Sequence, residues 1–461
     1  MYGGWKSGES DQIQRIEETN SKMQIHTVTI LGANGTMGRN IAAIFASFGG
    51  AQVYLVSRTK EKSIRAKDKA YQSVRAESVK EKMIPADYSE LEECIRQSDL
   101  VFEACAEDWN IKVEIHSRIA EILTTLEGKG KIICTGTSGL SITGLAELYP
   151  EEYRCLFMGM HFFNPPYNMP LCELTPTKYS DRTVFEEVFD YGKKVLFRTM
   201  VEVKDSPAFL GNRIGFQFIN EALQTAEKYK YNGGIDYIDA ILGPFTGRAM
   251  APLVTADFVG LDVHKAIVDN LYENTNDYAH NTFILPQFAE MLIKENRLGR
   301  KTGEGLYKTI IHDSGAKIRQ VYDIEHGYYR NVMKYQFPFV EEMVSAFQVG
   351  DYEKGFAALI NNHSLEADLC CTFLLKYILY SLEAAKDVGY DIHSADDVMA
   401  AGFNWCPPLA ILEALGGIKV VEQLCVERLE QNILEKIQTK ELLEKAEQSR
   451  YDYRRFIKAK H

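Results

Sequence analysis

The sequence predicts an α/β domain built on a mostly parallel sheet, followed by all-α domains in tandem. Up to about residue 203, short β-branched runs alternate with stretches of helical periodicity, the pattern typical of a parallel sheet. After Lys204 the apolar spacing becomes helical, and part of that helical pattern recurs farther along the chain. With 461 residues, 46% of them hydrophobic, the chain has room for about three domains.

A glycine-rich turn between a strand and a helix is the first functional signal. Residues 24–31 alternate as a strand does, residues 39–48 have a helical pattern, and three glycines lie between them. Such glycines permit a tight turn, let a pyrophosphate approach the backbone, and place a helix N-terminus against its charge. This context favours a Rossmann-type dinucleotide-binding domain over a plain turn. The predicted cofactor-binding residues of the loop are Gly32, Asn34, Gly35, Thr36, Met37 and Gly38.

The end of the second predicted strand, residues 51–56, bears on the choice of cofactor. An acid at this point normally grips the ribose 2′-hydroxyl of NAD. This chain has Ser57 and Arg58 instead, which could accept a 2′-phosphate and therefore support NADP. Alternatively, Arg58 is a solvated loop residue and NAD binds without the acid. The basic start of the next helix, from Lys60, is interpreted as a solvated face or, alternatively, as a phosphate contact.

One histidine and one glutamate form the candidate acid/base pair. The apolar run 157–163 carries His161, and a short run after the Pro165-Pro166 pair carries Glu173. The prolines exclude a continuous helix, so two strands joined by a loop can bring the side chains together. A carboxylate beside a histidine fixes its tautomer and raises its proton affinity. Taken alone, a core histidine with an unrelated surface glutamate is the simpler interpretation.

Polar residues near other element ends extend the candidate site. Glu107 and Lys112 follow a buried strand, at the kind of strand end where parallel sheets bind ligands. Ser138 follows the next strand and could donate to a substrate oxygen or only cap a helix. Asn212 stands at the start of a helix predicted over 213–230, where its amide could hold an oxygen or act as a cap.

The chain divides by pattern into six parts. We expect a polar tail (1–22), an NAD(P)-binding domain (23–203), a helical domain (204–310), a helical connector (311–363), a second degenerate helical repeat (364–425) and a charged C-terminal helix (426–461).

The second helical part echoes the first. Residues 377–385 resemble 218–226, and residues 394–399 resemble 235–240. In this register Asn212 falls opposite Cys371, so the second copy lacks the polar group singled out in the first. We interpret it as a packing module that buries the apolar face of the first copy.

Charge and cysteine content exclude several classes. The net charge of −12 argues against nucleic acid or an anionic membrane as the main partner. Nine scattered cysteines without ligand spacing indicate reduced thiols in a cytoplasmic protein without a structural metal. The polar N-terminal tail lacks a signal-peptide pattern and no apolar run reaches membrane-spanning length, so we expect a soluble, unexported protein.

Several separated motifs resemble the 3-hydroxyacyl-CoA dehydrogenase family over residues 24–308, with a fainter match over 365–425. They are His161-Phe-Phe-Asn-Pro with Glu173, Thr137-Ser138, Lys204-Asp-Ser-Pro with Asn212-Arg213, Ala256-Asp-Phe-Val-Gly-Leu-Asp262, and Leu298-Gly-Arg-Lys-Thr-Gly-Glu-Gly305. The Asn-Pro-Pro form and the tandem helical domain look like the long, often hydratase-fused branch. No crotonase-like domain is expected, because every segment is already assigned.

The resemblance implies an NAD(P)-dependent enzyme that transfers a hydride reversibly between (S)-3-hydroxyacyl-CoA and the cofactor, in fatty-acid β-oxidation or short-chain acyl-CoA metabolism. It implies that His161 is the general base and that Glu173 orients it. Ser138 and Asn212 would hydrogen-bond the substrate oxygen. The alternatives are a non-catalytic dinucleotide-binding relative and an oxidoreductase of free 3-hydroxy acids.

At the cofactor end, the resemblance places Glu107 and Lys112 near the nicotinamide ribose, and three features depart from the family pattern. The loop reads GxxGxxG rather than GxGxxG, the acid after the second strand is missing, and Gly136 stands where the family usually has asparagine. The implied partner is an acyl-CoA, and the chain is expected to be a homodimer or a monomer with an internal pseudo-dimer.

Overall fold

The structure is a computed structural model that describes residues 23–126, 130–312 and 315–460. The predicted tail at 1–22 lies outside the described residues. The chain divides into two compact units, one up to Ser206 and one from Pro207 onward, a few residues beyond the domain end predicted at 203. Among the described residues, no helix is long and apolar enough to cross a membrane.

The first unit is built on an eight-stranded sheet in the order β3-β2-β1-β4-β5-β6-β7-β8. The strands are β1 (Thr27–Leu31), β2 (Gln52–Ser57), β3 (Met83–Asp87), β4 (Leu100–Glu103), β5 (Ile132–Thr135), β6 (Phe157–Phe162), β7 (Leu171–Thr175) and β8 (Thr199–Glu202). Neighbouring strands are parallel except β6 and β7, which confirms the Rossmann-type prediction. The strand order reverses at β1, beside β4, where such sheets bind ligands.

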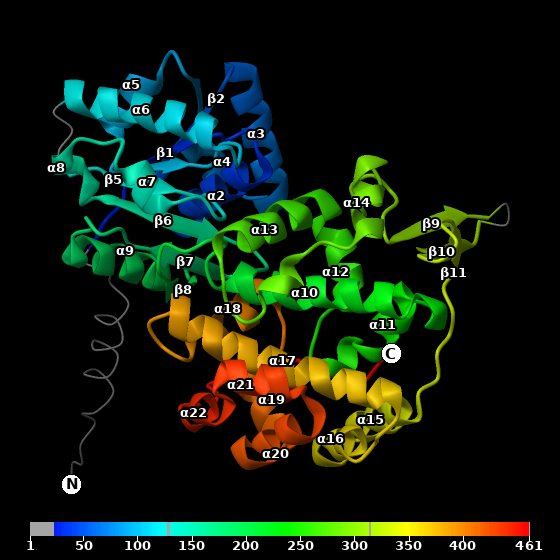
Figure 1. The fold of residues 1–461 in the computed structure, drawn as a ribbon. Helices are drawn as coiled ribbons and strands as arrows, with labels where there is room; N and C mark the ends of the chain where they lie inside the picture. Colours follow the sequence, from blue (N-terminus) through cyan, green and yellow to red (C-terminus); the bar gives the residue numbers. More distant parts are fainter. Residues whose placement is uncertain (1–22, 127–129, 313–314, 461) are drawn as a thin grey trace, which may run out of the picture. The chain divides into compact units, whose positions relative to one another are not determined.

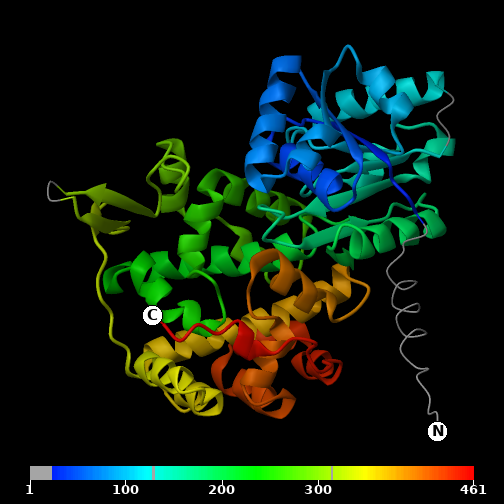
Figure 2. The same ribbon diagram turned by 180° about the vertical axis from the view of Figure 1, so that it is seen from behind.

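Helices cover both faces of this sheet (Figures 1 and 2). They are α2 (Thr36–Ser47), α3 (Lys60–Val74), α4 (Glu77–Lys82), α5 (Leu91–Gln97), α6 (Trp109–Thr125), α7 (Ile142–Ala146), α8 (Glu151–Arg154) and α9 (Arg182–Lys194). The central helix α2 is mostly apolar, and its fully buried Phe45 packs edge-on against Phe102 of β4 and stacks with Tyr191 of α9. This core holds the glycine loop at the end of β1 in place.

The second unit is mainly helical and centred on α10, most of whose residues are buried. Its first helices are α10 (Gly211–Lys228), α11 (Ile235–Ile241), α12 (Pro252–Val259), α13 (Leu261–Asn274) and α14 (Gln287–Lys294), with short 3-10 turns η1 (Lys230–Asn232), η2 (Pro244–Thr246) and η3 (His280–Phe283). Its later helices are α15 (Pro338–Gln348), α16 (Tyr352–Ile360), α17 (Leu365–Val388), α18 (Ser394–Phe403), α19 (Pro408–Ala414) and α20 (Ile418–Arg428).

The predicted helical connector at 311–363 is helical only in its second half. Its start belongs to a three-stranded antiparallel sheet of β9 (Tyr307–Ile311), β10 (Lys317–Tyr322) and β11 (Tyr329–Asn331), with β10 in the middle. The charged residues hid a strand in which exposed and less exposed positions alternate before Val321 and Tyr322 become buried. Gly327 adopts a positive φ in the tight β10–β11 connection.

The predicted C-terminal helix at 426–461 is also wrong as a single element. It is divided among the end of α20, α21 (Gln431–Ile437), α22 (Thr439–Glu444) and the short η4 (Tyr453–Arg455). Gln438 has φ +50°, which breaks the helix between α21 and α22. Beyond α22, Ser449 donates to Asp396 and Tyr451 donates to Asp397. These tertiary bonds hold the charged segment in a non-helical path.

The two helical copies share a capping arrangement. Asp239 of α11 accepts a hydrogen bond from the backbone N–H of Leu253 at 2.8 Å, and Asp396 of α18 accepts one from Leu409 at 2.9 Å. Each aspartate therefore caps the next, proline-initiated helix. This equivalence corrects the predicted register of 394–399, which had placed Asp396 opposite Tyr237.

Candidate active site

The glycine loop fits the pyrophosphate of a dinucleotide. Gly32 has φ +75°, and a Cβ there would lie 2.5 Å from the carbonyl oxygen of Ala104. A Cβ on Gly38 would lie 2.5 Å from the Gly32 oxygen. At Gly35 such an atom would lie 3.3 Å from the carbonyl oxygen of Gly32, a tighter contact than most Cβ atoms make. Helix α2 begins there with no acid in its first turn and no side-chain cap, as an anion site requires.

The extra residue of the loop is taken up by a tight turn. The Gly35 N–H donates to the Gly32 oxygen at 3.0 Å. Asn34 and Thr36 are exposed, whereas Met37 is half-buried against the core. The loop therefore keeps its glycine contacts and its open helix N-terminus despite the longer spacing.

His161 and Glu173 lie opposite each other on neighbouring antiparallel strands. They are a register pair of β6 and β7, so their side chains extend from the same face of the sheet. His161 Nδ1 lies 2.9 Å from Glu173 Oε2, and both side chains are buried. A carboxylate accepts and cannot donate, so Nδ1 carries the proton and Nε2 is the nitrogen that can take up another. The predicted dyad geometry is therefore present.

Glu107 connects the two loops that follow β4 and β5. One of its oxygens accepts from the Thr137 hydroxyl at 2.5 Å and from the Ser138 backbone N–H at 2.8 Å. Its other oxygen lies 3.6 Å from Lys112 Nζ. The structure thus brings the predicted Glu107, Lys112 and Ser138 together at one edge of the sheet, although Lys112 belongs to the first turn of α6 rather than to the preceding loop.

A buried network behind this loop was missed. Glu103 is fully buried, and both of its oxygens lie 2.9 Å from Lys112 Nζ. His116 Nε2 lies 3.3 Å away. Burial alone would raise the pKa of Glu103, but its bonds to His116 and Lys112 and the charge of Lys112 hold that pKa well below its usual range. Burial lowers the pKa of His116, although the neighbouring carboxylate of Glu103 acts in the opposite direction. The sequence did contain a signal for this network. Glu103 ends an apolar strand, and Lys112 and His116 are four residues apart on one helix.

The ring of Phe102 explains why a glycine occupies position 136. A Cβ at this position would lie 2.9 Å from Cε1 of Phe102, which is fully buried in β4. An asparagine, expected from the family pattern, would require this ring to move. The glycine is therefore matched to a bulky residue on the adjacent strand.

Asn212 lies in the second compact unit, within the first turn of α10. Leu210 is the N-cap residue of this helix and no side chain caps it, so the structure does not support a capping role for Asn212. The next residue, Arg213, is buried and its Nη2 lies 2.8 Å from Asp277 Oδ2. Its Nε donates to the hydroxyl of Tyr380 in α17 at 3.3 Å. The second helical copy therefore helps to hold the turn that carries Asn212.

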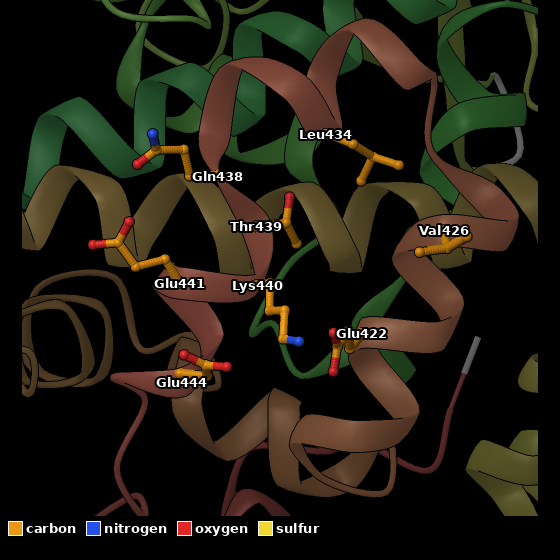
Figure 3. A pocket seen from close by; sticks show the side chains of 8 residues that line it. All are labelled: Glu422, Val426, Leu434, Gln438, Thr439, Lys440, Glu441 and Glu444. Carbon is orange, nitrogen blue, oxygen red and sulfur yellow. The ribbon is translucent and has the colours of Figure 1, made fainter.

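A groove of about 550 Å³ lies among the last helices of the second unit (Figure 3). It is lined by Glu422, Val426, Leu434, Gln438, Thr439, Lys440, Glu441 and Glu444. None of the predicted site residues lines it. Three of the lining side chains are glutamates, which does not suit an anionic CoA ester.

Two family models match consecutive parts of the chain. The model described as "3-hydroxyacyl-CoA dehydrogenase, NAD binding domain" matches residues 27–206, and the model of the C-terminal domain of the same enzyme matches residues 209–309. The chain belongs to the 3-hydroxyacyl-CoA dehydrogenase family. The family named from the motifs at His161, Ser138 and Asn212 is therefore confirmed.

Relatives of two lengths belong to this family. The hydroxyacyl-coenzyme A dehydrogenase of Homo sapiens mitochondria is 32% identical over 303 residues, which cover 62% of this chain and 92% of that protein. A probable 3-hydroxyacyl-CoA dehydrogenase of Bacillus subtilis is 28% identical over 427 residues, 87% of this chain. The chain spans 52% of the length of that longer relative.

Solved structures extend the likeness to the second helical copy. A 3-hydroxybutyryl-CoA dehydrogenase from Escherichia coli K12 matches with a TM-score of 0.66 and covers 92% of this chain and 100% of its own, at 20% identity. At that identity the match shows the fold alone. The (S)-3-hydroxybutyryl-CoA dehydrogenase of Ralstonia eutropha is 30% identical and has a TM-score of 0.54 over 61% of this chain and 98% of its own.

Proposed function

We propose that this chain is an NAD(P)-dependent 3-hydroxyacyl-CoA dehydrogenase that interconverts (S)-3-hydroxyacyl-CoA and 3-oxoacyl-CoA. The observation that carries the proposal is the 2.9 Å contact between His161 Nδ1 and Glu173 Oε2, in a sheet that also carries the glycine loop. A non-catalytic dinucleotide-binding relative has no need of such a pair.

In this proposal His161 takes the proton of the 3-hydroxyl group at Nε2, because Nδ1 already donates to Glu173. The carboxylate of Glu173 stabilises the imidazolium that forms and keeps the ring in one orientation. Ser138 and Asn212 hydrogen-bond the substrate oxygen and stabilise its developing charge. Glu107 keeps Ser138 in place through its backbone N–H. The bound nicotinamide cofactor supplies the hydride acceptor, or the hydride donor in the reverse direction.

The test is oxidation of NADH and NADPH by the wild-type chain, followed spectrophotometrically with acetoacetyl-CoA and with free acetoacetate. Turnover of the CoA ester supports the proposal, and turnover of the free acid alone favours an oxidoreductase of free 3-hydroxy acids. We expect His161→Gln to lose about 10²-fold or more of kcat, the usual share of a general base. A variant that keeps the full rate contradicts the assignment of the base, and absence of turnover with every acyl-CoA contradicts the function.

We further propose that the chain is a monomer in which the second helical copy takes the place of a partner subunit. Equivalent residues of the two copies contact each other, as in an isologous interface. The rings of Phe218 and Tyr377 lie 5.8 Å apart, edge to face. Arg248 and Trp405, equivalent in the register set by the capping aspartates, form an antiparallel bridge. Sedimentation of a monomer supports this proposal, whereas an obligate dimer contradicts it.

We also propose that the protein is cytoplasmic. This location is supported by nine free cysteines, none of which forms a disulfide among the described residues. Cell fractionation of the native protein tests it, and recovery from an exported fraction would contradict it.

A further inference from the structure

The end of β2 lacks the group that selects NAD. The last residue of this strand is Ser57, which is buried, and its hydroxyl has no hydrogen-bond partner within the described chain. In NAD-selective domains a carboxylate at this point normally accepts a hydrogen bond from the 2′-hydroxyl of the adenine ribose. Ser57 itself supplies no negative charge that would repel a 2′-phosphate.

The residues that follow are suited to a phosphate. Arg58 is exposed and takes part in no hydrogen bond or ion pair of the described residues. Thr59 is the N-cap residue of α3, a helix of 15 residues, and its side chain does not cap the helix. Lys62 lies in the first turn of α3 and likewise has no ion-pair partner among the described residues. The turn therefore offers two cations next to a helix N-terminus, which favours a dianion.

The acids near this turn are already engaged. Asp87 of β3 is the register partner of Ser57, but its carboxylate accepts from the backbone N–H and the hydroxyl of Ser89. Glu90 is paired with Lys60 at 2.8 Å. Hydrogen bonding to its own backbone N–H and to Thr59 lowers the pKa of Glu61, which favours its ionised form. Lys60 therefore neutralises Glu90, whereas the bonds of Asp87 come from neutral groups and leave its charge in place. Arg58 and Lys62 are cations of this turn without an ion-pair partner among the described residues, and they are the groups that can bind a phosphate.

We infer that this chain selects NADP over NAD, with Arg58 and Lys62 binding the 2′-phosphate of the adenine ribose. The inference rests on the proposed dinucleotide-dependent function and departs from the NAD named in the family model. It assigns a specificity role to Ser57 and Arg58, which the resemblance to the family left undecided.

Binding can be measured without any acyl-CoA substrate. Calorimetric titration of the full chain with 2′,5′-ADP and with 5′-ADP isolates the contribution of the 2′-phosphate, and titration with NADPH and NADH tests the whole cofactor. We expect tighter binding of both 2′-phosphorylated ligands. Equal or weaker binding of NADPH relative to NADH overturns the inference, while the acyl-CoA turnover assay is unaffected by that outcome.

The variant Arg58→Ala should weaken NADPH binding about 10–100-fold, the effect of losing a hydrogen bond to a charged group, and leave NADH binding unchanged. Because Arg58 is exposed, the substitution should not disturb the fold. Arg65→Ala, an exposed arginine of the same helix, is the matched control and should change neither affinity. Ser57→Asp should reverse the preference toward NADH. An Arg58→Ala variant that weakens both cofactors equally contradicts the assignment.

Discussion

Two buried carboxylates, Glu103 of the first unit and Asp239 of the second, differ in what surrounds them. In the first unit, Glu103 faces Lys112 Nζ at 2.9 Å and its pKa lies well below the usual range. In the helical unit, the partners of Asp239 among the described residues are two backbone N–H groups and the Tyr307 hydroxyl, and burial raises its pKa to about 7 despite these bonds. A fixed cation keeps a buried acid ionised, whereas neutral donors do not fully compensate for its desolvation. The charged carboxylate adjoins the candidate site, and the other has a structural role.

Removing the cation of the first unit should have the largest effect. Lys112→Met leaves the fully buried Glu103 without its charged partner, and we expect a loss of about 3–5 kcal/mol in the free energy of unfolding. Urea denaturation measures it. Lys178→Met removes an exposed partner of Glu147 and is the matched control, with an expected loss of about 0–1 kcal/mol. Equal losses for the two substitutions would contradict the prediction, because they would show that the buried Glu103 does not depend on Lys112 for its stability.

Glu173 provides the next test, because it is a buried carboxylate whose partner is a histidine. Glu173→Gln preserves size but not charge, and we expect kcat to fall about 10–100-fold, as for other groups that orient a reacting side chain. The KM for acetoacetyl-CoA should change little, since the lost interaction belongs to the transition state. Glu186→Gln, at an exposed position of α9, should leave both constants unchanged. A purely structural role would instead lower the melting temperature without changing kcat of the folded fraction.

The last test concerns pH dependence. The pKa of Asp239 is raised from 3.8 to about 7, so between these values the folded chain binds a proton that the unfolded chain does not. This aspartate therefore makes stability fall as the pH rises from about 4 to 7. Glu103 acts in the opposite direction, because its lowered pKa gives stability that is lost only on acidification below its unfolded pKa.

Asp239→Asn separates these contributions. We compare melting temperatures at pH 5 and pH 8. The melting temperature of the variant should fall less between these two pH values than that of the wild type. Asp257 and Asp396, whose pKa values burial raises to about 6, remain in both proteins and cancel in the comparison. An unchanged pH dependence would mean that Asp239 is ionised in the folded chain throughout this range.

Prediction from the sequence succeeded where a short segment carries its own structural signal. The glycine loop stands between a clear strand and a clear helix, and the Pro165-Pro166 pair separates the two strands that carry His161 and Glu173. Prediction failed at β10, because its charged residues concealed the alternation of exposed and buried positions. It also failed after α22, where contacts with residues distant in the sequence determine the path of the chain. The charged composition of that segment favours a helix, but Ser449 and Tyr451 bond to α18 instead.

By itself, the sequence determined the Rossmann-type architecture, the family and the residues of the candidate acid/base pair, because each depends on local periodicity and on motif spacing. Only the tertiary structure decided how the supporting residues act. The ion pair of Glu103 with Lys112 joins β4 to α6, and the match of Gly136 to Phe102 joins the end of β5 to β4. The absence of an acid at Ser57 is visible in the sequence. The hydrogen bonds of Asp87 with Ser89 and the ion pair of Glu90 with Lys60 are visible only in the structure. Contacts of this kind depend on packing in three dimensions, which sequence periodicity does not encode.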